Sequence, residues 1–388
     1  MKVCFETFGC RLNRAEALED EARLLARGWT RTEKHSDADL IVVRGCSVTA
    51  RAQRDCERLI GHIRRKYPLK KLVLTGCLSA KNEIFLPRAD EEEDPSRPAV
   101  PTRTARAYLK VQDGCSGKCT FCIVPRFRGT SRSEPFGEVI AKAKRFIDAG
   151  YREIVVTGCN LSLYASGGVR LDGLLAALAE IDPSCRIRLG SLEPSPVAMK
   201  VLDTVAEHSN ICRFLHIPIQ SCSPGVLTMM KRPYTMRDVE ELVAGAERRF
   251  PSISIGCDLI AGFPGERELD HLATRGFLRR HRFTNAHVFP YSERPGTAAE
   301  KFPGALPREI RKARAKELAA VIEKKRTEYA RSFIGKIVET VIEDEKECAG
   351  WTSEYLWCRC KGASAERKGV QRVKVLSNER HVLIGSPI

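Results

Sequence analysis

The chain has 388 residues, 43% of them hydrophobic, and a formal net charge of +16 at pH 7. This length favours two or three domains, and no apolar run approaches the ~18 residues that a membrane span needs. The first residues, "MKVCFETFGC", lack the layout of a secretion signal, so we expect a cytoplasmic protein. The positive charge suggests a polyanionic partner such as nucleic acid, although a merely basic soluble protein fits the composition equally well.

Strand and helix patterns alternate at the start of the chain. Three apolar runs, "KVCFETF", "ADLIVVRG" and "KKLVLTG", are typical of short strands. The segments "NRAEALEDEARLLARG" and "TARAQRDCERLIGHIRRKY" have the composition and spacing of helices. This alternation indicates a parallel sheet, so we expect a small α/β domain over residues 1–80. Residues 81–104 are rich in proline and charge and are predicted to be a linker.

The alternation then resumes over a longer stretch, residues 105–330. The strands are predicted at 107–112, 152–157, 186–190, 213–219, 253–260 and 285–290. The helices are predicted at 134–149, 171–181, 195–207, 236–249 and 266–280. Such a series of strand–helix units indicates a full or partial parallel barrel, with an open doubly wound sheet as the alternative.

The last part of the chain changes character. The segment "PREIRKARAKELAAVIEKKRTEYARSFIG" predicts a helix with one apolar side and one basic side. A basic run of this kind is usually only a solvated face. The segments "GKIVETVIED", "YLWCRCKG", "GVQRVKVLS" and "RHVLIG" predict short strands, so we expect a small all-β barrel over residues 331–388.

Three cysteines are clustered in "DGCSGKCTFC", just after the first strand of the expected barrel: Cys115, Cys119 and Cys122. The C-terminal ends of strands hold the chemistry in parallel barrels. Three thiolates on one tight loop suit an iron–sulfur cluster. A structural zinc site needs a fourth ligand, which His216 or Cys159 could supply, but this cysteine spacing is unusual for zinc. We therefore favour iron and sulfur over zinc.

A second set of cysteines is spread over the first domain. Cys10, Cys46 and Cys77 each follow one of the three predicted strands, and each follows a glycine. In a parallel sheet the C-terminal ends of the strands lie along one edge, so these cysteines are expected to converge. Three unrelated buried cysteines are the alternative. The equivalence of the three positions favours a second metal centre.

With these residues identified, "GCSGKCTFC" and its continuation "IVPRFRGTSRSEP" resemble the radical S-adenosylmethionine (SAM) methylthiotransferases. Other segments that resemble this family are "TFGCRLN", "EIVVTGCNLSLY", "RLGSLEPS", "FLHIPIQSCSPGVLTMMKRPYT", "DLIAGFPGE" and "FPYSERPGT". The resemblance covers nearly the whole chain. It implies an N-terminal methylthiotransferase domain, a partial (β/α)6 radical SAM barrel and a C-terminal TRAM-like barrel that binds RNA.

Within this family the chain is most similar to the branch that modifies threonylcarbamoyladenosine (t6A) beside the anticodon of tRNA. "TFGCRLN" and "TGCNLSLY" indicate this branch. The isopentenyladenosine branch usually shows "GCQMN", and the branch that acts on a ribosomal protein usually shows "GCPKN". The chain departs from the family at Arg44 and Gly45, where Asn-Thr is usual, and in a short segment between Cys77 and Cys115.

The resemblance implies two 4Fe–4S clusters, one on Cys115, Cys119 and Cys122 and an auxiliary one on the other three cysteines. It implies SAM as the cofactor, radical hydrogen abstraction from C2 of the adenine, and insertion of a methylthio group at that carbon. A flavodoxin or ferredoxin is expected as electron donor and the protein as a monomer. Contacts to SAM are expected at the strand ends, from Gly158, Asn160, Glu193, Gln220, Asp258 and Gly262. Tyr291 is a weaker candidate. A turn before a proline for Gly262 and a cap for Asp258 are the alternatives.

The basic helix and the small barrel are expected to meet the anticodon stem-loop of tRNA. The candidate phosphate contacts are Arg308, Arg311, Lys312, Lys324, Lys325 and Arg326. Trp351, Tyr355 and Trp357 could stack on bases, although packing inside the small barrel explains them equally well. Two rivals remain open: a methylthiotransferase that acts on isopentenyladenosine or on a ribosomal protein, and a zinc-dependent nucleic-acid-binding protein.

Overall fold

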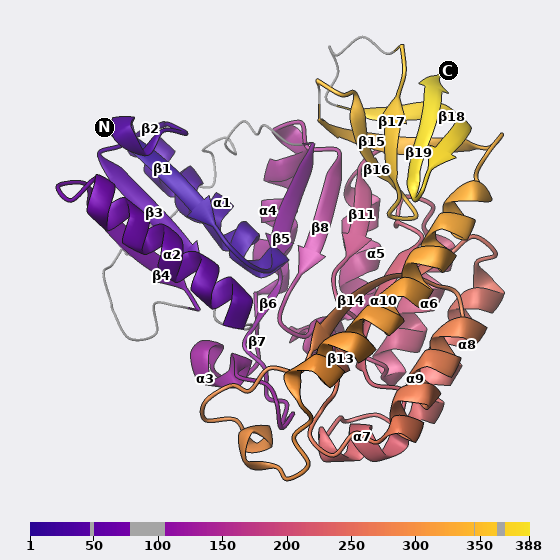
Figure 1. The fold of residues 1–388 in the computed structure, drawn as a ribbon. Helices are drawn as coiled ribbons and strands as arrows, with labels where there is room; N and C mark the ends of the chain where they lie inside the picture. Colours follow the sequence, from indigo (N-terminus) through magenta and orange to yellow (C-terminus); the bar gives the residue numbers. More distant parts are fainter. Residues whose placement is uncertain (47–49, 78–104, 345, 363–368) are drawn as a thin grey trace.

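The computed structural model describes residues 1–46, 50–77, 105–344, 346–362 and 369–388. The predicted linker, residues 81–104, lies outside the described residues. Figure 1 shows three parts in chain order: a small sheet with two helices, a larger curved array of strands and helices, and a small barrel at the C-terminus. No helix in the described part of the chain is long and apolar enough to cross a membrane.

The N-terminal part is a parallel four-stranded sheet in the order β2-β1-β3-β4. Its strands are β1 (Lys2–Thr7), β2 (Thr30–Arg31), β3 (Leu40–Gly45) and β4 (Lys71–Gly76). Its helices are α1 (Arg11–Ala26), η1 (His35–Asp37) and α2 (Ala50–Lys66). The three strands predicted from the sequence are present, and the two-residue β2 is added. Separate apolar clusters on the two faces of the sheet hold α1 on one side and α2 on the other.

The central part contains six parallel strands in two groups, β11-β8-β5 and β12-β13-β14. The strands are β5 (Arg106–Lys110), β8 (Glu153–Thr157), β11 (Arg186–Leu189), β12 (Phe214–Gln220), β13 (Ser254–Ala261) and β14 (Phe283–Pro290). Bridges between Ile187 and Ile211 and between Ser191 and His216 join the two groups. The six strands therefore form the predicted partial barrel.

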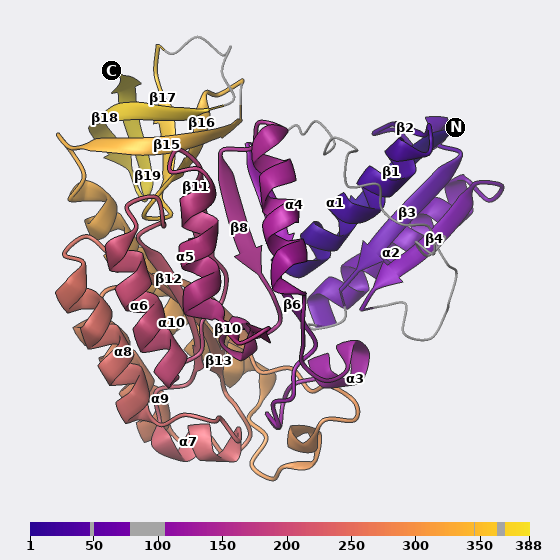
Figure 2. The same cartoon turned by 180° about the vertical axis from the view of Figure 1, so that it is seen from behind.

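Helices cover the outside of this barrel (Figure 2). They are α4 (Phe136–Asp148), α5 (Leu171–Ile181), α6 (Pro196–Glu207), α8 (Met236–Arg249) and α9 (Glu268–Arg280). Each lies within a few residues of its predicted range. The sequence analysis missed the short helices α3 (Val124–Arg128) and α7 (Pro224–Met229) and the pairs β6 (Gln112–Asp113) with β7 (Arg132–Ser133) and β9 (Ala165–Ser166) with β10 (Val169–Arg170). It also missed η2 (Leu161–Leu163) and η3 (Ala298–Lys301).

The barrel strands alternate in character between their two faces, as the period of two in a strand requires. The outward side chains, such as Leu109, Val156 and Leu259, belong to the large apolar core under the helices. The inward side chains are mostly polar and contact one another across strands, as Arg188 contacts Glu153 and His216 contacts Asp258. The inner space of the barrel, called the lumen below, is therefore lined by polar groups.

Helix α10 (Arg308–Arg331) packs on β14 and leads into a closed five-stranded barrel. Its strands are β15 (Ile337–Asp344), β16 (Ala349–Thr352), β17 (Trp357–Cys360), β18 (Val370–Glu379) and β19 (Val382–Pro387). The sequence predicted this barrel but only four of its strands, because β16 was missed. The small barrel lies beside the beginning of β5, β8 and β11, whereas the cysteine loop follows their other end (Figure 1).

Candidate active site

The loop after β6 brings Cys115, Cys119 and Cys122 together. It is held by backbone hydrogen bonds from Cys115 to Gly129 (3.0 Å) and from Cys122 to the carbonyl of Cys119 (3.1 Å). Gly114 has a φ of +66°, and a Cβ built there would lie 2.0 Å from the carbonyl oxygen of Thr130. Only glycine fits this close approach. The loop therefore curls tightly, and its sulfur atoms gather on one side.

Two groups among the described residues bring three ligand atoms within 4.8 Å of one another: Cys4 with Glu6 and His35, and His216 with Asp258 and His287. Neither cysteine set of the predicted clusters is among them. The preference for iron and sulfur over zinc at the two cysteine sets comes from their spacing in the sequence.

Burial and one arginine determine the charge of these thiols. Burial raises the pKa of Cys122 to about 11, and it also raises the pKa of Cys119. The guanidinium of Arg232 opposes this effect at Cys119, because Nη1 lies 3.1 Å from Sγ. A thiol must lose its proton to bind iron. Arg232 therefore favours the form of Cys119 that binds metal.

Arg232 also joins the cysteine loop to two residues that were predicted from the sequence. It forms an ion pair with Glu193, and Glu193 accepts a hydrogen bond of 2.7 Å from Nδ2 of Asn160. The backbone N–H of Asn160 donates to Gln112 at 2.8 Å. Asn160 and Glu193 are thus brought to the cysteine loop, as expected for a shared site. The sequence analysis missed Arg232, although it lies within the quoted motif "MKRPYT".

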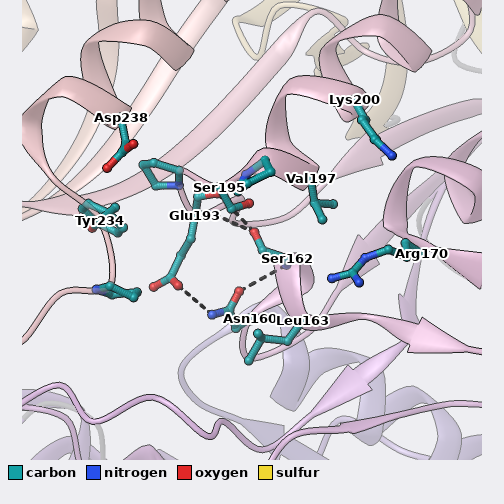
Figure 3. A pocket seen from close by; sticks show the side chains of 13 residues that line it. Asn160, Ser162, Leu163, Arg170, Glu193, Ser195, Val197, Lys200, Tyr234 and Asp238 are labelled. Carbon is teal, nitrogen blue, oxygen red and sulfur yellow. Dashed lines mark hydrogen bonds between the residues drawn. The ribbon is translucent and has the colours of Figure 1, made fainter.

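A cavity of about 520 Å³ opens beside this network. Figure 3 shows Asn160 between Glu193 and Ser162 at one wall of the cavity. Nδ2 of Asn160 donates to the carboxylate of Glu193, the backbone N–H of Ser162 donates to Oδ1 of Asn160, and the hydroxyl of Ser162 donates to the backbone carbonyl of Glu193. Tyr234 lines another part of the wall and donates from its hydroxyl to the carbonyl of Pro218 at 2.7 Å. The wall comes from segments that follow β8, β11 and β12, where parallel barrels place their ligands.

Three further predicted residues lie at strand ends with special backbone requirements. A Cβ at Gly158 would lie 2.9 Å from Oε1 of Gln112, and one at Gly262, where φ is +74°, would lie 2.6 Å from Cγ of Arg311. Gln220 has a φ of +69°, which is rare for a residue other than glycine. Close packing thus explains both glycines. Contact between these three residues and a cofactor stays a prediction.

Asp258 lies in the lumen between two histidines. Its carboxylate is 3.0 Å from Nε2 of His216 and 3.0 Å from Nδ1 of His287. Burial alone would raise the pKa of Asp258, but the charge of His216 and hydrogen bonds from both rings hold it well below the usual range. This aspartate already has two partners inside the protein. Its predicted contact to SAM stays a prediction.

The second cysteine set converges at the C-terminal edge of the N-terminal sheet. Cys10 precedes α1 and is exposed, whereas Cys46 and Cys77 are buried just after β3 and β4. A Cβ at Gly9 would lie 2.7 Å from Sγ of Cys46, so the backbone before Cys10 touches the second cysteine. Burial raises the pKa of Cys77, the charge of Arg128 lowers it, and the nearby Cys10 raises it.

Asn13 and Arg128 organise the space between the two cysteine sets. Asn13 is fully buried and donates from Nδ2 to the carbonyls of Phe8 (2.8 Å) and Gly45 (3.0 Å). Arg128 donates to Oδ1 of Asn13 at 2.8 Å and to Oδ1 of Asp113 at 3.0 Å. Asp113 precedes the cysteine loop, so one arginine connects both sites. The sequence analysis assigned no role to either residue, although each lies in a quoted motif.

The predicted RNA contacts on α10 are not equivalent. Arg308, Lys312 and Lys324 are exposed, and Lys325 and Arg326 are partly buried. Arg311 is buried and is engaged inside the protein, because it donates to the carbonyl of Leu306 at 2.6 Å. The expectation that Arg311 meets a phosphate is therefore wrong for this fold. Arg311 was misplaced because its charge continues the basic pattern of the helix while its side chain packs against the end of β13.

The aromatic residues of the small barrel are also used for packing. Tyr355 stacks between Phe214 and Trp351, with ring centroids 4.5 Å apart in both pairs. Trp357 contacts Trp351 edge to face at 5.0 Å. The stack joins the small barrel to β12. The packing alternative therefore describes these aromatic residues better than base stacking does.

Comparison with known proteins agrees with this geometry. Residues 109–278 match the Radical SAM superfamily, and residues 2–94 match a family described as uncharacterized protein family UPF0004. The chain is 30% identical to the threonylcarbamoyladenosine tRNA methylthiotransferase MtaB of Bacillus subtilis, covering 96% of this chain and 93% of that protein. It is 31% identical to the tRNA-2-methylthio-N(6)-dimethylallyladenosine synthase of Chlorobium limicola, covering 89% and 87%.

A solved structure shares the fold. The radical SAM methyltransferase TsrM from Kitasatospora setae aligns with a TM-score of 0.55 and 15% identity over 77% of each chain. The partial parallel barrel with its three-cysteine loop therefore defines a radical SAM enzyme. Because its full-length relatives are methylthiotransferases, the chain belongs to the radical SAM methylthiotransferase family. Such an enzyme uses SAM and two 4Fe–4S clusters, in agreement with the two cysteine sets.

Proposed function

We propose that this protein is a tRNA methylthiotransferase that adds a methylthio group to C2 of t6A beside the anticodon. The observation that carries the proposal is the position of two cysteine sets on either side of Arg128, at the C-terminal ends of two parallel sheets. For the substrate, the support is the "TFGCRLN" motif and the two relatives named MtaB, which are 30% and 31% identical. The dimethylallyladenosine synthases are equally similar, so identity alone does not choose between the substrates.

We assign the radical SAM cluster to Cys115, Cys119 and Cys122 and the auxiliary cluster to Cys10, Cys46 and Cys77. When bound, the clusters and SAM supply the radical that activates the C2–H bond and the sulfur that replaces its hydrogen. The protein positions these groups. Arg232 holds Cys119 and Glu193 in place, and the carboxylate of Glu193 suits the amino group of SAM.

The remaining assignments concern partners and domains. We propose phosphate contacts from the five α10 residues other than Arg311 that were predicted for this role: Arg308, Lys312, Lys324, Lys325 and Arg326. A flavodoxin or ferredoxin is proposed as electron donor, and the enzyme is proposed to act as a monomer in the cytoplasm. The proposed domain limits are 1–80, 81–104, 105–330 and 331–388.

Mass spectrometry of tRNA nucleosides tests the reaction and its substrate. The anaerobic holoenzyme is incubated with SAM, a reductant and tRNA that contains either t6A or isopentenyladenosine. We expect the mass gain of a methylthio group on t6A only. A gain on isopentenyladenosine alone would support the activity named for the Chlorobium relatives. No gain on either RNA would contradict the proposed tRNA substrates.

Variants of the two cysteine sets test the two assignments separately. Cys119→Ala is expected to abolish both SAM cleavage and methylthiolation, because the cofactor loses its cluster. Cys77→Ala is expected to abolish methylthiolation while SAM cleavage remains. Cys348→Ser, a cysteine in the core of the small barrel, is the control and is expected to keep both activities. Loss of SAM cleavage in the Cys77 variant, with its radical SAM cluster intact, would contradict the assignment.

A further inference from the structure

Helix α1 directs two arginines toward residues of the radical SAM barrel: Arg11, which is half-buried, and Arg14, which is exposed. Nη2 of Arg11 donates to the hydroxyl of Tyr355 at 3.1 Å, and Nη1 lies 3.4 Å from the carbonyl oxygen of Leu189. Nη1 of Arg14 donates to the hydroxyl of Tyr108 at 3.2 Å, and Tyr108 lies on the inner face of β5. Residues three apart on a helix lie on one face, so the two guanidinium groups belong to one surface.

These two arginines differ from the cations of the lumen in having no counter-charge. Arg186 and Arg188 form ion pairs with Glu153, at 2.6 and 2.8 Å. Within the described residues, Arg11 and Arg14 have no carboxylate within 4.0 Å, and their partners are phenol hydroxyls and a carbonyl. A guanidinium with neutral partners only keeps its full positive charge available to an anionic ligand.

The position of this arginine pair relates it to the substrate. Arg11 directly follows Cys10 of the auxiliary set, and its guanidinium reaches Leu189 at the C-terminal end of β11. Glu193, which joins the radical SAM loop through Arg232, lies four residues further along the chain. If the proposed function is right, the adenine must lie between the two cysteine sets. Substituents on that base therefore come within reach of Arg11 and Arg14.

We propose that Arg11 and Arg14 form the subsite that binds the carboxylate of the threonylcarbamoyl group of t6A. The fork of an arginine matches a carboxylate with two parallel hydrogen bonds. The isopentenyl group is apolar and has no such partner, so it leaves two charged side chains unpaired beside it. The subsite thereby selects t6A over isopentenyladenosine. This inference rests on the proposed function and identifies the residues that choose its substrate.

Binding measurements with three anticodon stem-loops test the subsite. The RNAs contain t6A, the methyl ester of t6A, or isopentenyladenosine, and the protein is the anaerobic holoenzyme. The wild-type enzyme is expected to bind the t6A RNA most tightly. Arg11→Gln and Arg14→Gln are expected to weaken that binding on the order of tenfold to a hundredfold and to leave binding of the ester unchanged. Arg11→Lys and Arg14→Lys, which keep the charge, should restore part of the loss.

The control is Arg27→Gln, an exposed arginine at the C-terminal end of the same helix. It is expected to affect all three RNAs alike. Iron content equal to that of the wild-type enzyme shows that a variant keeps both clusters, including the auxiliary cluster proposed for Cys10.

Each other outcome has a distinct meaning. If the variants weaken binding of the t6A RNA and of its ester equally, or weaken neither, the proposed subsite is wrong. Methylthiolation of t6A by the wild-type enzyme would still support the proposed function in that case. If the wild-type enzyme methylthiolates isopentenyladenosine and not t6A, the proposed substrate is overturned, and the subsite falls with it.

Discussion

Asn13 connects two backbone segments beside the proposed auxiliary cluster site. It is fully buried, and its two donated hydrogen bonds join the loop before Cys10 to the loop before Cys46. We predict that Asn13→Ala destabilises the protein by about 2–3 kcal/mol, because the buried carbonyl of Gly45 and the partly buried carbonyl of Phe8 lose their donor. Urea unfolding of the holoenzyme measures this effect.

The same variant is expected to lose iron from the auxiliary set. Iron content should fall from about eight atoms per chain toward about four, since each cluster contributes four. Asn13→Asp keeps the size and the acceptor for Arg128 but removes both donors, so it is expected to lose iron as well. Full iron occupancy in both variants would show that Asn13 has no part in assembling the site.

Arg44 is a second instance at the residue scale, and it is where the chain departs from its family. The side chain packs against α1, where it pairs with Glu16 at 2.6 Å and also with Asp20. All three groups are largely buried. Arg44 therefore holds α1 against β3.

Removing Arg44 takes one cationic partner from each of two largely buried acids, although Glu16 still pairs with Arg128 and Asp20 with Arg23. We predict that Arg44→Ala costs about 2–3 kcal/mol in the free energy of unfolding, measured with urea. The control is Arg51→Ala on α2, whose pair with Asp55 is 3.8 Å long and whose side chain is 90% exposed. That variant should change stability by less than about 1 kcal/mol. Equal effects of the two substitutions would contradict the role given to Arg44.

At the scale of elements, the join between β13 and α10 depends on a glycine. Gly262 has a φ of +74°, and a Cβ there would lie 2.6 Å from Cγ of Arg311 on α10. Gly28 offers a matched control, because its φ is +84° and a Cβ there would meet nothing within 4 Å. Comparing the two alanine variants therefore separates backbone strain from steric overlap.

We predict that Gly28→Ala costs about 1–2 kcal/mol, the strain of a left-handed residue alone. Gly262→Ala is expected to cost about 1–3 kcal/mol more, because α10 must also shift away from the added methyl group. Urea unfolding measures both. A cost at Gly262 no greater than that at Gly28 would show that Arg311 moves aside without penalty.

The elements themselves follow from local patterns, and the missed ones lack such patterns. The six barrel strands were predicted because each is an apolar run between helical segments. The four-residue β16 is too short for an alternating pattern to be visible. Only glycine fits at position 350, because a Cβ there would lie 1.8 Å from the carbonyl oxygen of Val341. That contact is between strands, so no local pattern reports it.

The same contrast holds for the candidate site. The six cysteines could be proposed as ligands because strand ends and loop spacing are local features of the sequence. Arg128 and Asn13 were missed because they lie 115 residues apart, and their contact exists only after the two domains have packed. Arg311 was misjudged because a buried and an exposed arginine look alike in a helix whose charges surround its apolar side. Contacts of this kind can be identified only from the three-dimensional structure.

At the scale of the whole molecule, the small barrel covers the beginning of the radical SAM strands through a charged layer. Glu153 is fully buried and pairs with Arg186 and Arg188. The two arginines also donate to backbone carbonyls of the small barrel, Arg186 to Trp351 and Arg188 to Thr352, each at 2.8 Å. One carboxylate is thus the shared counter-ion of the two arginines that join the domains. The junction should therefore respond to acid.

Burial alone would raise the pKa of Glu153, but the charges of Arg188 and Arg186 hold it well below the usual range. Because the pKa is lower in the folded state, this carboxylate contributes stability that is fully present above the unfolded pKa of about 4.3 and is lost as the pH falls below it. Between pH 6 and pH 4 the loss from this group alone is about 0.7 kcal/mol.

Glu153→Gln tests this linkage. The variant is expected to be less stable than wild type by about 3–5 kcal/mol at pH 6, because the buried arginines lose their counter-ion. It lacks the titrating group, so the difference from wild type should shrink by about 0.7 kcal/mol when urea unfolding is repeated at pH 4. Glu339→Gln, an exposed glutamate on β15, is the matched control and should follow the wild-type curve. A Glu153→Gln curve parallel to wild type would place the acid sensitivity of the junction elsewhere.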